Sequence, residues 1–162
     1  MITKLFRYAL GSLLAGGFLA GCGSAPTQPV VSDLQFPVLV IYLNAGHERF
    51  DDAASLGDMS MQSVLMYKEP PFLIDSAMRI FQLADLKSTK SGLAIMASGG
   101  AGRTPVSFTL TATSDAGVVA ARGLVQKHCN AFRDGPDADR RREELAKAET
   151  IPQIIAAIEG QR

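Results

Sequence analysis

The sequence predicts an α+β fold, in which a small antiparallel β-sheet packs against helices and the C-terminal third is helical. Residues 36–43 (FPVLVIYL) form an apolar run rich in β-branched and aromatic residues, which is typical of a buried strand. Residues 106–113 alternate strictly between apolar and polar side chains, as in a strand with one wet face. From residue 115 onward, apolar residues instead recur at helical spacing.

The first 21 residues have the features of a secretory signal peptide. Lys4 and Arg7 supply a positive start, and residues 8–20 are uncharged and mostly apolar. This apolar run is too short for a transmembrane helix, which needs roughly 20 residues. It ends in the motif Leu19-Ala20-Gly21-Cys22.

That motif resembles the lipobox of bacterial lipoproteins. The resemblance implies cleavage between Gly21 and Cys22, a diacylglycerol thioether on Cys22, and acylation of the new amine. Each buried lipid CH₂ adds about 0.8 kcal/mol, so several acyl chains anchor far better than one. In that family an Asp after the cysteine favours the inner membrane. Gly23 therefore implies that the protein is anchored at the periplasmic face of the outer membrane, with the inner membrane as the alternative. The alternative to lipidation is an ordinary signal peptide in which the cysteine has no role.

The chain is expected to divide into a signal peptide (1–21), a lipidated cysteine with a flexible tether (22–32) and one periplasmic α+β domain (33–162). The tether is small, polar and Pro-containing. Outside the leader the chain has 14 basic and 16 acidic residues, a net charge of −2, and this balance does not favour nucleic-acid binding. A lipid on Cys22 leaves Cys129 without a disulfide partner, so a hydrophobic core must stabilise the domain.

Two short elements are expected after the first strand. Residues 47–56 should form one or two helical turns ended by Gly57, and residues 61–67 should form a second strand.

Residues 72–84 fit both a helix and a strand. In favour of a helix, Pro71 suits a first turn, and Asp75 and Arg79 have the i,i+4 spacing of a helical ion pair. Read as a strand, both faces mix polar and apolar residues, although Ile and Phe are good strand formers. We therefore favour a helix and keep the strand as the alternative.

Two strands are expected next, at residues 92–98 and 106–113, joined by a glycine-rich hairpin loop at 99–102. The loop region only partly matches a P-loop, because Ala97 replaces the first Gly and Arg103 replaces the Lys. A strand rather than a helix follows it, so no helix N-terminus is available for phosphates. We expect no nucleotide here and interpret the loop as a hairpin tip or a partner contact.

The C-terminal third should contain three helical segments. The first, residues 115–132, is capped by Ser114 or Asp115. Its apolar stripe consists of Val118, Ala121, Val125, Cys129 and Phe132. Residues 136–148 are highly charged, with Leu145 as the single large apolar residue, and predict a solvated helix or a partly ordered linker.

The last helix is expected after Thr150. Thr150 and Gln153 match a capping box, and the isoleucines that follow should face inward. These are Ile154, Ile155 and Ile158.

His47-Glu48 and Asp51-Asp52 place an imidazole and carboxylates close together, and a metal site or catalytic pair could also draw on His47, His128 and Cys129. Zinc needs three or four ligands with supporting geometry, and these three have no such spacing. Neighbouring helical residues project about 100° apart, so His128 and Cys129 do not converge. A nucleophile also needs an orienting third group, and neither G-x-S-x-G nor S-x-x-K occurs. We expect no cofactor, no metal and no enzyme, with Cys129 as an inert buried thiol.

Two further groups have both a structural and a binding interpretation. Met59 and Met61 are expected to fill the core, with a sticky or metal-binding surface as the alternative. Arg140-Arg141-Arg142 is expected to be a solvated helix face, with contact to an acidic partner or anionic headgroups as the alternative.

Residues 36–50 (FPVLVIYLNAGHERF) resemble the opening strand and loop of the outer-membrane lipoproteins of type VI secretion systems. That family is a small β-sandwich on a lipidated tether, which docks onto an inner-membrane partner. This chain departs from it in its three expected C-terminal helices.

The sequence thus predicts a membrane-anchored lipoprotein that binds another envelope protein as a docking or assembly component of an envelope or secretion complex. Two alternatives stay open, namely an immunity or inhibitor lipoprotein against a periplasmic toxin or enzyme, and a tethered periplasmic enzyme.

Overall fold

The computed structural model describes residues 28–43, 46–66, 68–90, 102–133 and 135–160. The expected signal peptide and lipidated Cys22, together with the tether as far as residue 27, lie outside these ranges. So do the expected strand 92–98 and all of the expected glycine-rich loop except Gly102.

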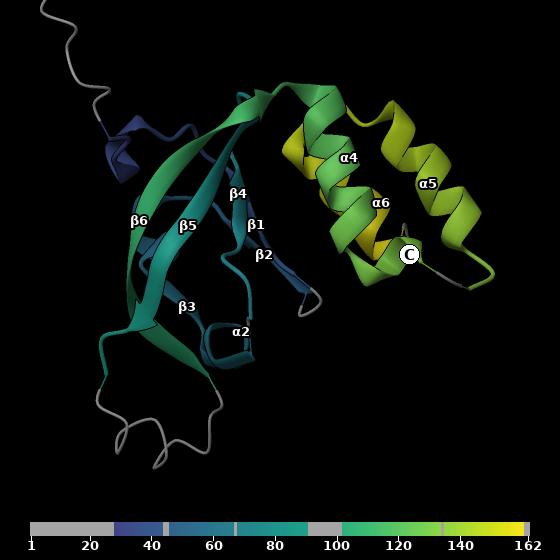
Figure 1. Cartoon of the computed structure of the whole chain (residues 1–162). Coiled ribbons are helices and arrows are strands. Elements are labelled where there is room, and N and C mark those ends of the chain that lie inside the picture. The colour runs from purple at the N-terminus through teal and green to yellow at the C-terminus, as the bar shows by residue number, and fades with distance from the viewer. Residues whose placement is uncertain (1–27, 44–45, 67, 91–101, 134, 161–162) are drawn as a thin grey trace, which may run out of the picture.

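The described residues form one antiparallel, curled sheet of six strands with helices, which confirms the α+β prediction (Figure 1). The strand order is β2-β1-β4-β5-β6-β3. The strands are β1 (Val38–Tyr42), β2 (Gly46–Phe50), β3 (Asp58–Ser60), β4 (Phe72–Ile74), β5 (Arg79–Ser88) and β6 (Arg103–Ala116). The strand β6 is long enough to extend well beyond its short neighbour β3.

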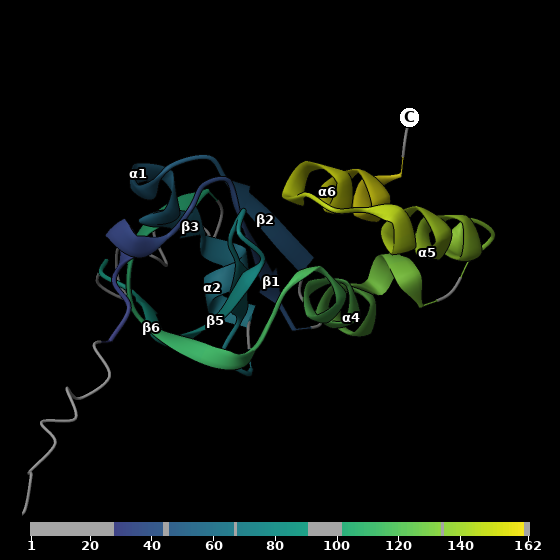
Figure 2. The same cartoon turned by 90° about the horizontal axis from the view of Figure 1, so that it is seen from above.

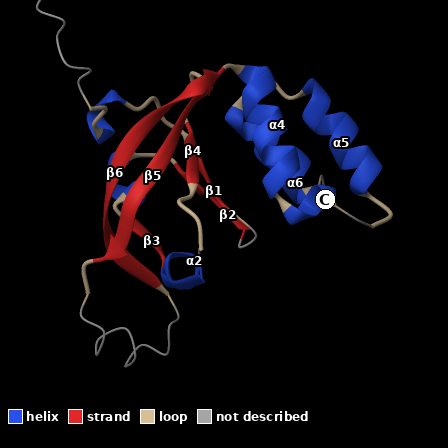
Figure 3. Ribbon diagram, viewed as in Figure 1, coloured by secondary structure: helices blue, strands red, loops and turns tan. Residues whose placement is uncertain are grey.

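The longer helices gather on one side of the sheet, as two perpendicular views show (Figures 1 and 2). They are α4 (Val118–His128), α5 (Ala138–Lys147) and α6 (Ile151–Glu159). Figure 3 shows them in blue beside the red sheet, which confirms the predicted helical C-terminal third. The shorter elements are the 3-10 helices η1 (Val31–Asp33) and η2 (Asn130–Phe132) and the helices α1 (Ala53–Leu56) and α2 (Met61–Met66).

The sheet separates two hydrophobic clusters, and β1 contributes to both. Leu39 and Ile41 face the helices, whereas Val38, Val40 and Tyr42 face the inside of the curl. All five are fully buried. The helix-side cluster also contains Val125, Leu145, Ile151, Ile154 and Ile158, and the inner cluster contains Phe50, Leu56, Met59, Leu73, Phe81, Leu83 and Leu110.

A side chain bridges the two end strands of the sheet. The Glu48 carboxylate on β2 accepts from the Ser60 N–H on β3, at 3.3 and 3.2 Å to its two oxygens. Arg103 on β6 lies 3.5 Å from the same carboxylate. The side chain of Glu48, rather than backbone hydrogen bonds between β2 and β3, therefore joins the two end strands of the curled sheet here.

The helix favoured for residues 72–84 is wrong, because these residues form β4, a tight turn and the first half of β5. Each face of these strands is covered, since Ile74 and Ile80 pack against the helices while Leu73 and Phe81 pack inside the curl. A strand buried on both faces loses its alternating pattern, and that loss produced the helical resemblance.

The Asp75–Arg79 ion pair was expected on a helix but forms across the β4–β5 turn. Asp75 is fully buried, and its Oδ2 lies 2.5 Å from Arg79 Nη2. Met78 in this turn has φ 59°, a left-handed conformation that an uninterrupted helix excludes.

Two other local predictions need correction. Residues 61–67 were expected as a strand, but Met61–Met66 form α2, with Met61 and Val64 buried one turn apart. Residues 47–56 were expected as one or two helical turns, but residues 47–50 belong to β2, and a single helical turn forms at Ala53–Leu56. The Asp52 carboxylate caps that turn by accepting from Ser55 N–H at 2.7 Å.

The C-terminal predictions hold, with shifted boundaries. The helix expected at 115–132 begins at Val118 after Gly117, not at the proposed caps Ser114 or Asp115, because β6 continues to Ala116. It ends at His128, because Cys129 is extended and a separate 3-10 helix, η2, follows. The charged segment forms α5, in which Leu145 is only 1% exposed. Thr150 begins the last helix with the predicted capping box, and Ile154, Ile155 and Ile158 are buried as expected.

Candidate binding site at the free edge of β6

The strand β6 has one covered edge and one edge that is covered only at its start. β5 pairs with β6 from Val106 to Ala116, whereas β3 pairs only with residues 103–105. Beyond β3, the Val106 N–H donates to the carbonyl of Gly57 at 3.0 Å. No strand of the described chain pairs with the outer edge of β6 after this point.

The hydrogen-bond pattern of the sheet fixes which groups of β6 point outward. The N–H of Leu83 on β5 points away from β6, because it donates to Pro71 O at 2.8 Å. Leu83 lies opposite Leu110 on β6, so these two residues form a non-hydrogen-bonded pair of the antiparallel ladder. By the same alternation, the N–H and C=O groups of Phe108, Leu110 and Ala112 point to the outer edge. None of these groups has a hydrogen-bond partner within the described residues.

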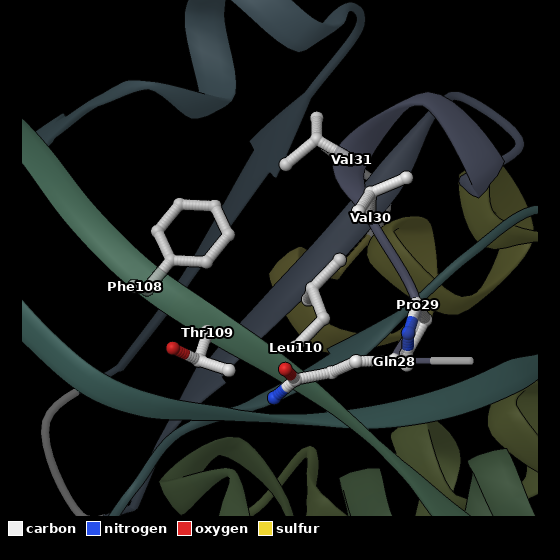
Figure 4. A pocket seen from close by; sticks show the side chains of 7 residues that line it. All are labelled: Gln28, Pro29, Val30, Val31, Phe108, Thr109 and Leu110. Carbon is white, nitrogen blue, oxygen red and sulfur yellow. The ribbon is translucent and has the colours of Figure 1, made fainter. Parts of the chain in front are cut away.

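A cavity of about 310 Å³ lies against this edge, between β6 and the chain that leads into the domain. Figure 4 shows Val30 and Val31 on one side of it, with Phe108 and Leu110 on the other. Its lining residues are Gln28, Pro29, Val30, Val31, Phe108, Thr109 and Leu110. Val30 is 54% exposed, whereas Val31 is partly buried against the inner cluster.

The segment that follows the cavity-lining residues 28–31 is held in place by the buried Asp75. The Asp75 carboxylate accepts from Gln35 N–H at 3.3 Å, and Ser76 N–H donates to Gln35 O at 2.9 Å. Arg79, which pairs with Asp75, also donates to Asp33 O at 2.6 Å. These bonds fix the segment that leads from the tether into β1.

The candidate metal ligands are not brought together into a site. His47 lies on β2, with Nε2 4.0 Å from Glu159 Oε1 on α6, whereas His128 ends α4 with its ring 6.1 Å from that of Phe72. Burial lowers the pKa of both imidazoles below the usual value. No cluster of three or more His, Cys, Asp or Glu side chains suitable for a metal occurs in the described ranges.

Cys129 is a buried core residue, 3% exposed, in the helix-side cluster. Burial raises the pKa of its thiol to about 11. At pH 8 only about one thiol in a thousand is then ionised, and the thiolate is the reactive form.

We therefore expect Cys129 to resist Ellman's reagent in the folded protein and to react fully once urea unfolds it. The measurement uses residues 22–162 with Cys22→Ser, in which Cys129 is the single thiol. Fast labelling without denaturant would contradict the buried placement and would make Cys129 a candidate reactive residue.

The methionines and arginines singled out earlier have structural roles. Met59 and Met61 are 0% and 1% exposed, which favours core packing over a metal-binding surface. Arg141 donates to Ile158 O and Arg142 to Phe132 O, each at 2.5 Å, so these side chains tie α5 to its neighbours. Arg140 lies 3.5 Å from Asp137 and is half exposed.

A second groove of about 350 Å³ runs between α4 and the sheet. Phe72, Ile80 and Leu124 give it an apolar floor, and Asp115 and Lys127 lie at its rim.

Reasoning from sequence did not find the site at β6. The alternating pattern of residues 106–113 predicted the strand, but a pattern of side chains does not say whether both backbone edges are paired. No signal in the sequence marks the unpaired edge, because every residue carries the same backbone groups.

No helix of the described residues is long and apolar enough to cross a membrane. Comparison with protein-family models, with curated proteins and with solved structures finds no match to this chain.

Proposed function

We propose that this chain is a lipid-anchored lipoprotein of the bacterial envelope that docks another envelope protein at the free edge of β6. One observation carries the proposal. The lipobox cysteine, Cys22, precedes the cavity-lining Gln28 by six positions. Six extended residues span at most about 20 Å, so a lipid on Cys22 would keep the cavity close to the membrane surface.

The chemistry of the cavity supports binding rather than catalysis. Its described lining residues are apolar or neutral, and none of them can act as an acid or base near pH 7. What the cavity offers is apolar side chains beside unpaired backbone groups, a combination that suits a polypeptide partner.

The test is photo-crosslinking in cells from a benzophenone residue placed at Thr111, an exposed position on β6. We expect the chain to incorporate labelled palmitate and to crosslink to one envelope protein. The variant Cys22→Ser should lose the palmitate label and most of the crosslink, because it is no longer held at the membrane.

Two matched controls accompany this test. Cys129→Ser should keep both the label and the crosslink, and a benzophenone at the exposed Gln126 on α4 should not give the same product. Palmitate incorporation in Cys22→Ser would overturn the anchor. A crosslink to a secreted toxin, rather than to an envelope component, would contradict the docking function and favour an immunity lipoprotein.

A further inference from the structure

We infer that the exposed face of α4 is a second docking surface, which takes an acidic amphipathic helix of another protein. This α4 face consists of Val119, Gly123, Gln126 and Lys127, the exposed residues of the helix. α4 lies between the sheet and α5 and packs on the helix-side cluster, whereas Val31 packs against the inner cluster (Figures 1 and 2). The surface is therefore separate from the cavity at β6 and does not depend on the docking proposed there.

Gly123 lies at the centre of the α4 face. Val119, one turn earlier, is 81% exposed. A Cβ atom added at Gly123 would meet no neighbouring element of the described chain within 4 Å, so the packing of these residues does not require a glycine. Glycine inside a helix lowers the stability of that helix relative to alanine. What the missing side chain does permit is the close approach of another backbone to α4.

A groove flanks α4 on each side, and Gly123 lines both grooves. The groove toward the sheet has a volume of about 350 Å³ and an apolar floor of Phe72, Ile80 and Leu124. The groove toward α5 has a volume of about 300 Å³ and reaches Leu145. Packed helices place the side chains of one helix in the hollows beside the ridges of the other. A partner helix that crosses α4 at Gly123 can therefore place an apolar side chain in each groove.

The charges around the two grooves set the sign of the partner. The lining residues include three cations, Arg122, Lys127 and Arg142, but one carboxylate, Asp115. Burial lowers the pKa of His128, which also lines a groove, so its imidazole is uncharged near pH 7. Neither Arg122 nor Lys127 lies within 4 Å of a carboxylate of the described residues. The complementary helix carries acidic residues beside its apolar stripe.

The same charges disfavour a second copy of this chain as the occupant. If two α4 faces packed symmetrically at Gly123, Arg122 and Lys127 of both copies would surround one contact. Like charges placed together in this way repel, whereas carboxylates of an acidic helix would pair with them. The backbone of α4 is hydrogen-bonded within the helix, so this surface recognises side chains, as in the binding of a helix in a groove.

The experiment uses residues 22–162 with Cys22→Ser, labelled with ¹⁵N, and an end-blocked peptide of about 20 residues as the probe. Leucines form one helical stripe of the peptide, and its other positions are Glu and Ala. We expect saturable shift changes confined to α4 and the residues that line the two grooves. A control peptide with Lys in place of Glu should bind at least about tenfold more weakly.

Two variants, each with a matched control, test the glycine and the charge. Gly123→Leu should fold with a urea midpoint no lower than the parent's, because it enters open space and leucine favours a helix. It should weaken the acidic peptide at least about tenfold, whereas Ala54→Leu on the exposed turn α1 should not. Lys127→Glu should weaken the peptide by a similar factor, whereas Lys87→Glu, at an exposed position of β5, should not.

Four results would overturn the inference. The first is the absence of saturable shifts up to the solubility limit of the peptide, and the second is a set of shifts that lies outside α4 and its grooves. The third is binding that neither Gly123→Leu nor Lys127→Glu weakens. The fourth is a dimer in sedimentation that Gly123→Leu converts to a monomer, which would mean that a second copy covers the α4 face. If Gly123→Leu does not fold, the shift map and the charge reversal decide. The experiment involves neither the lipid nor the cavity at β6, so its outcome is independent of the crosslinking test.

Discussion

Replacing Asp75 by alanine is expected to lower the free energy of unfolding by about 3–5 kcal/mol. The carboxylate is fully buried and accepts from the backbone N–H groups of Gln35, Ala77 and Arg79, at 3.3, 3.1 and 3.0 Å. It also accepts from Arg79 Nε at 2.8 Å. Alanine leaves these donors without their acceptor and frees the segment that precedes β1.

Urea unfolding of residues 22–162 measures this change in the free energy of unfolding. Asp115→Ala is the control, because Asp115 is exposed at the end of β6, and it should leave the unfolding midpoint unchanged. Asp75→Asn keeps one carbonyl acceptor but not the charge. Its loss in free energy of unfolding should therefore lie between those of Asp115→Ala and Asp75→Ala. A loss below about 1 kcal/mol for Asp75→Ala would show that the turn is held by packing instead.

Leu145→Ala should lower the free energy of unfolding by about 2–5 kcal/mol, the range for removing a buried leucine side chain. Leu145 is the one large apolar residue of α5 and is 1% exposed in the helix-side cluster. Leu145 belongs to the same cluster as Ile151 and Ile154 of α6, so a cavity there would weaken the packing of α5 against the cluster. Calorimetry or urea unfolding gives the value.

Lys147→Ala is the matched control within the same helix. Its ammonium lies 2.7 Å from Glu143 Oε1, but both side chains are largely exposed, and such pairs contribute little in water. We expect no measurable change in the unfolding midpoint. Equal losses in free energy of unfolding for Lys147→Ala and Leu145→Ala would contradict the view that Leu145 is the residue that packs α5 against the core.

Local signals predicted the parts of the fold whose environment is simple. The capping box at Thr150 and the strand at Val38–Tyr42 are confirmed because a cap and a run of β-branched residues act over a few positions. The segment from Phe72 to Ala84 failed because its environment is tertiary. Helices cover one face and the inner cluster covers the other, and neither is visible in the local sequence.

The candidate site was harder to predict than the fold. It is built from residues 28–31, assigned to the tether, and from residues 108–110, assigned to an ordinary strand. Its chemistry lies in backbone groups, which every residue carries, so no motif marks it. The Asp75–Arg79 pair shows the converse, since the right pairing was predicted from a helix that does not form.

The way in which the chain enters the domain also has a mechanical consequence. A pull on the segment before η1 reaches the protein at Asp33 and Gln35, which are tied to the β4–β5 turn, and then at β1. β1 lies between β2 and β4 and is hydrogen-bonded to both. Tension directed along β1 would therefore load two ladders in shear, with their bonds sharing the force rather than breaking one after another. The segment before η1 is thus attached where the sheet can carry load.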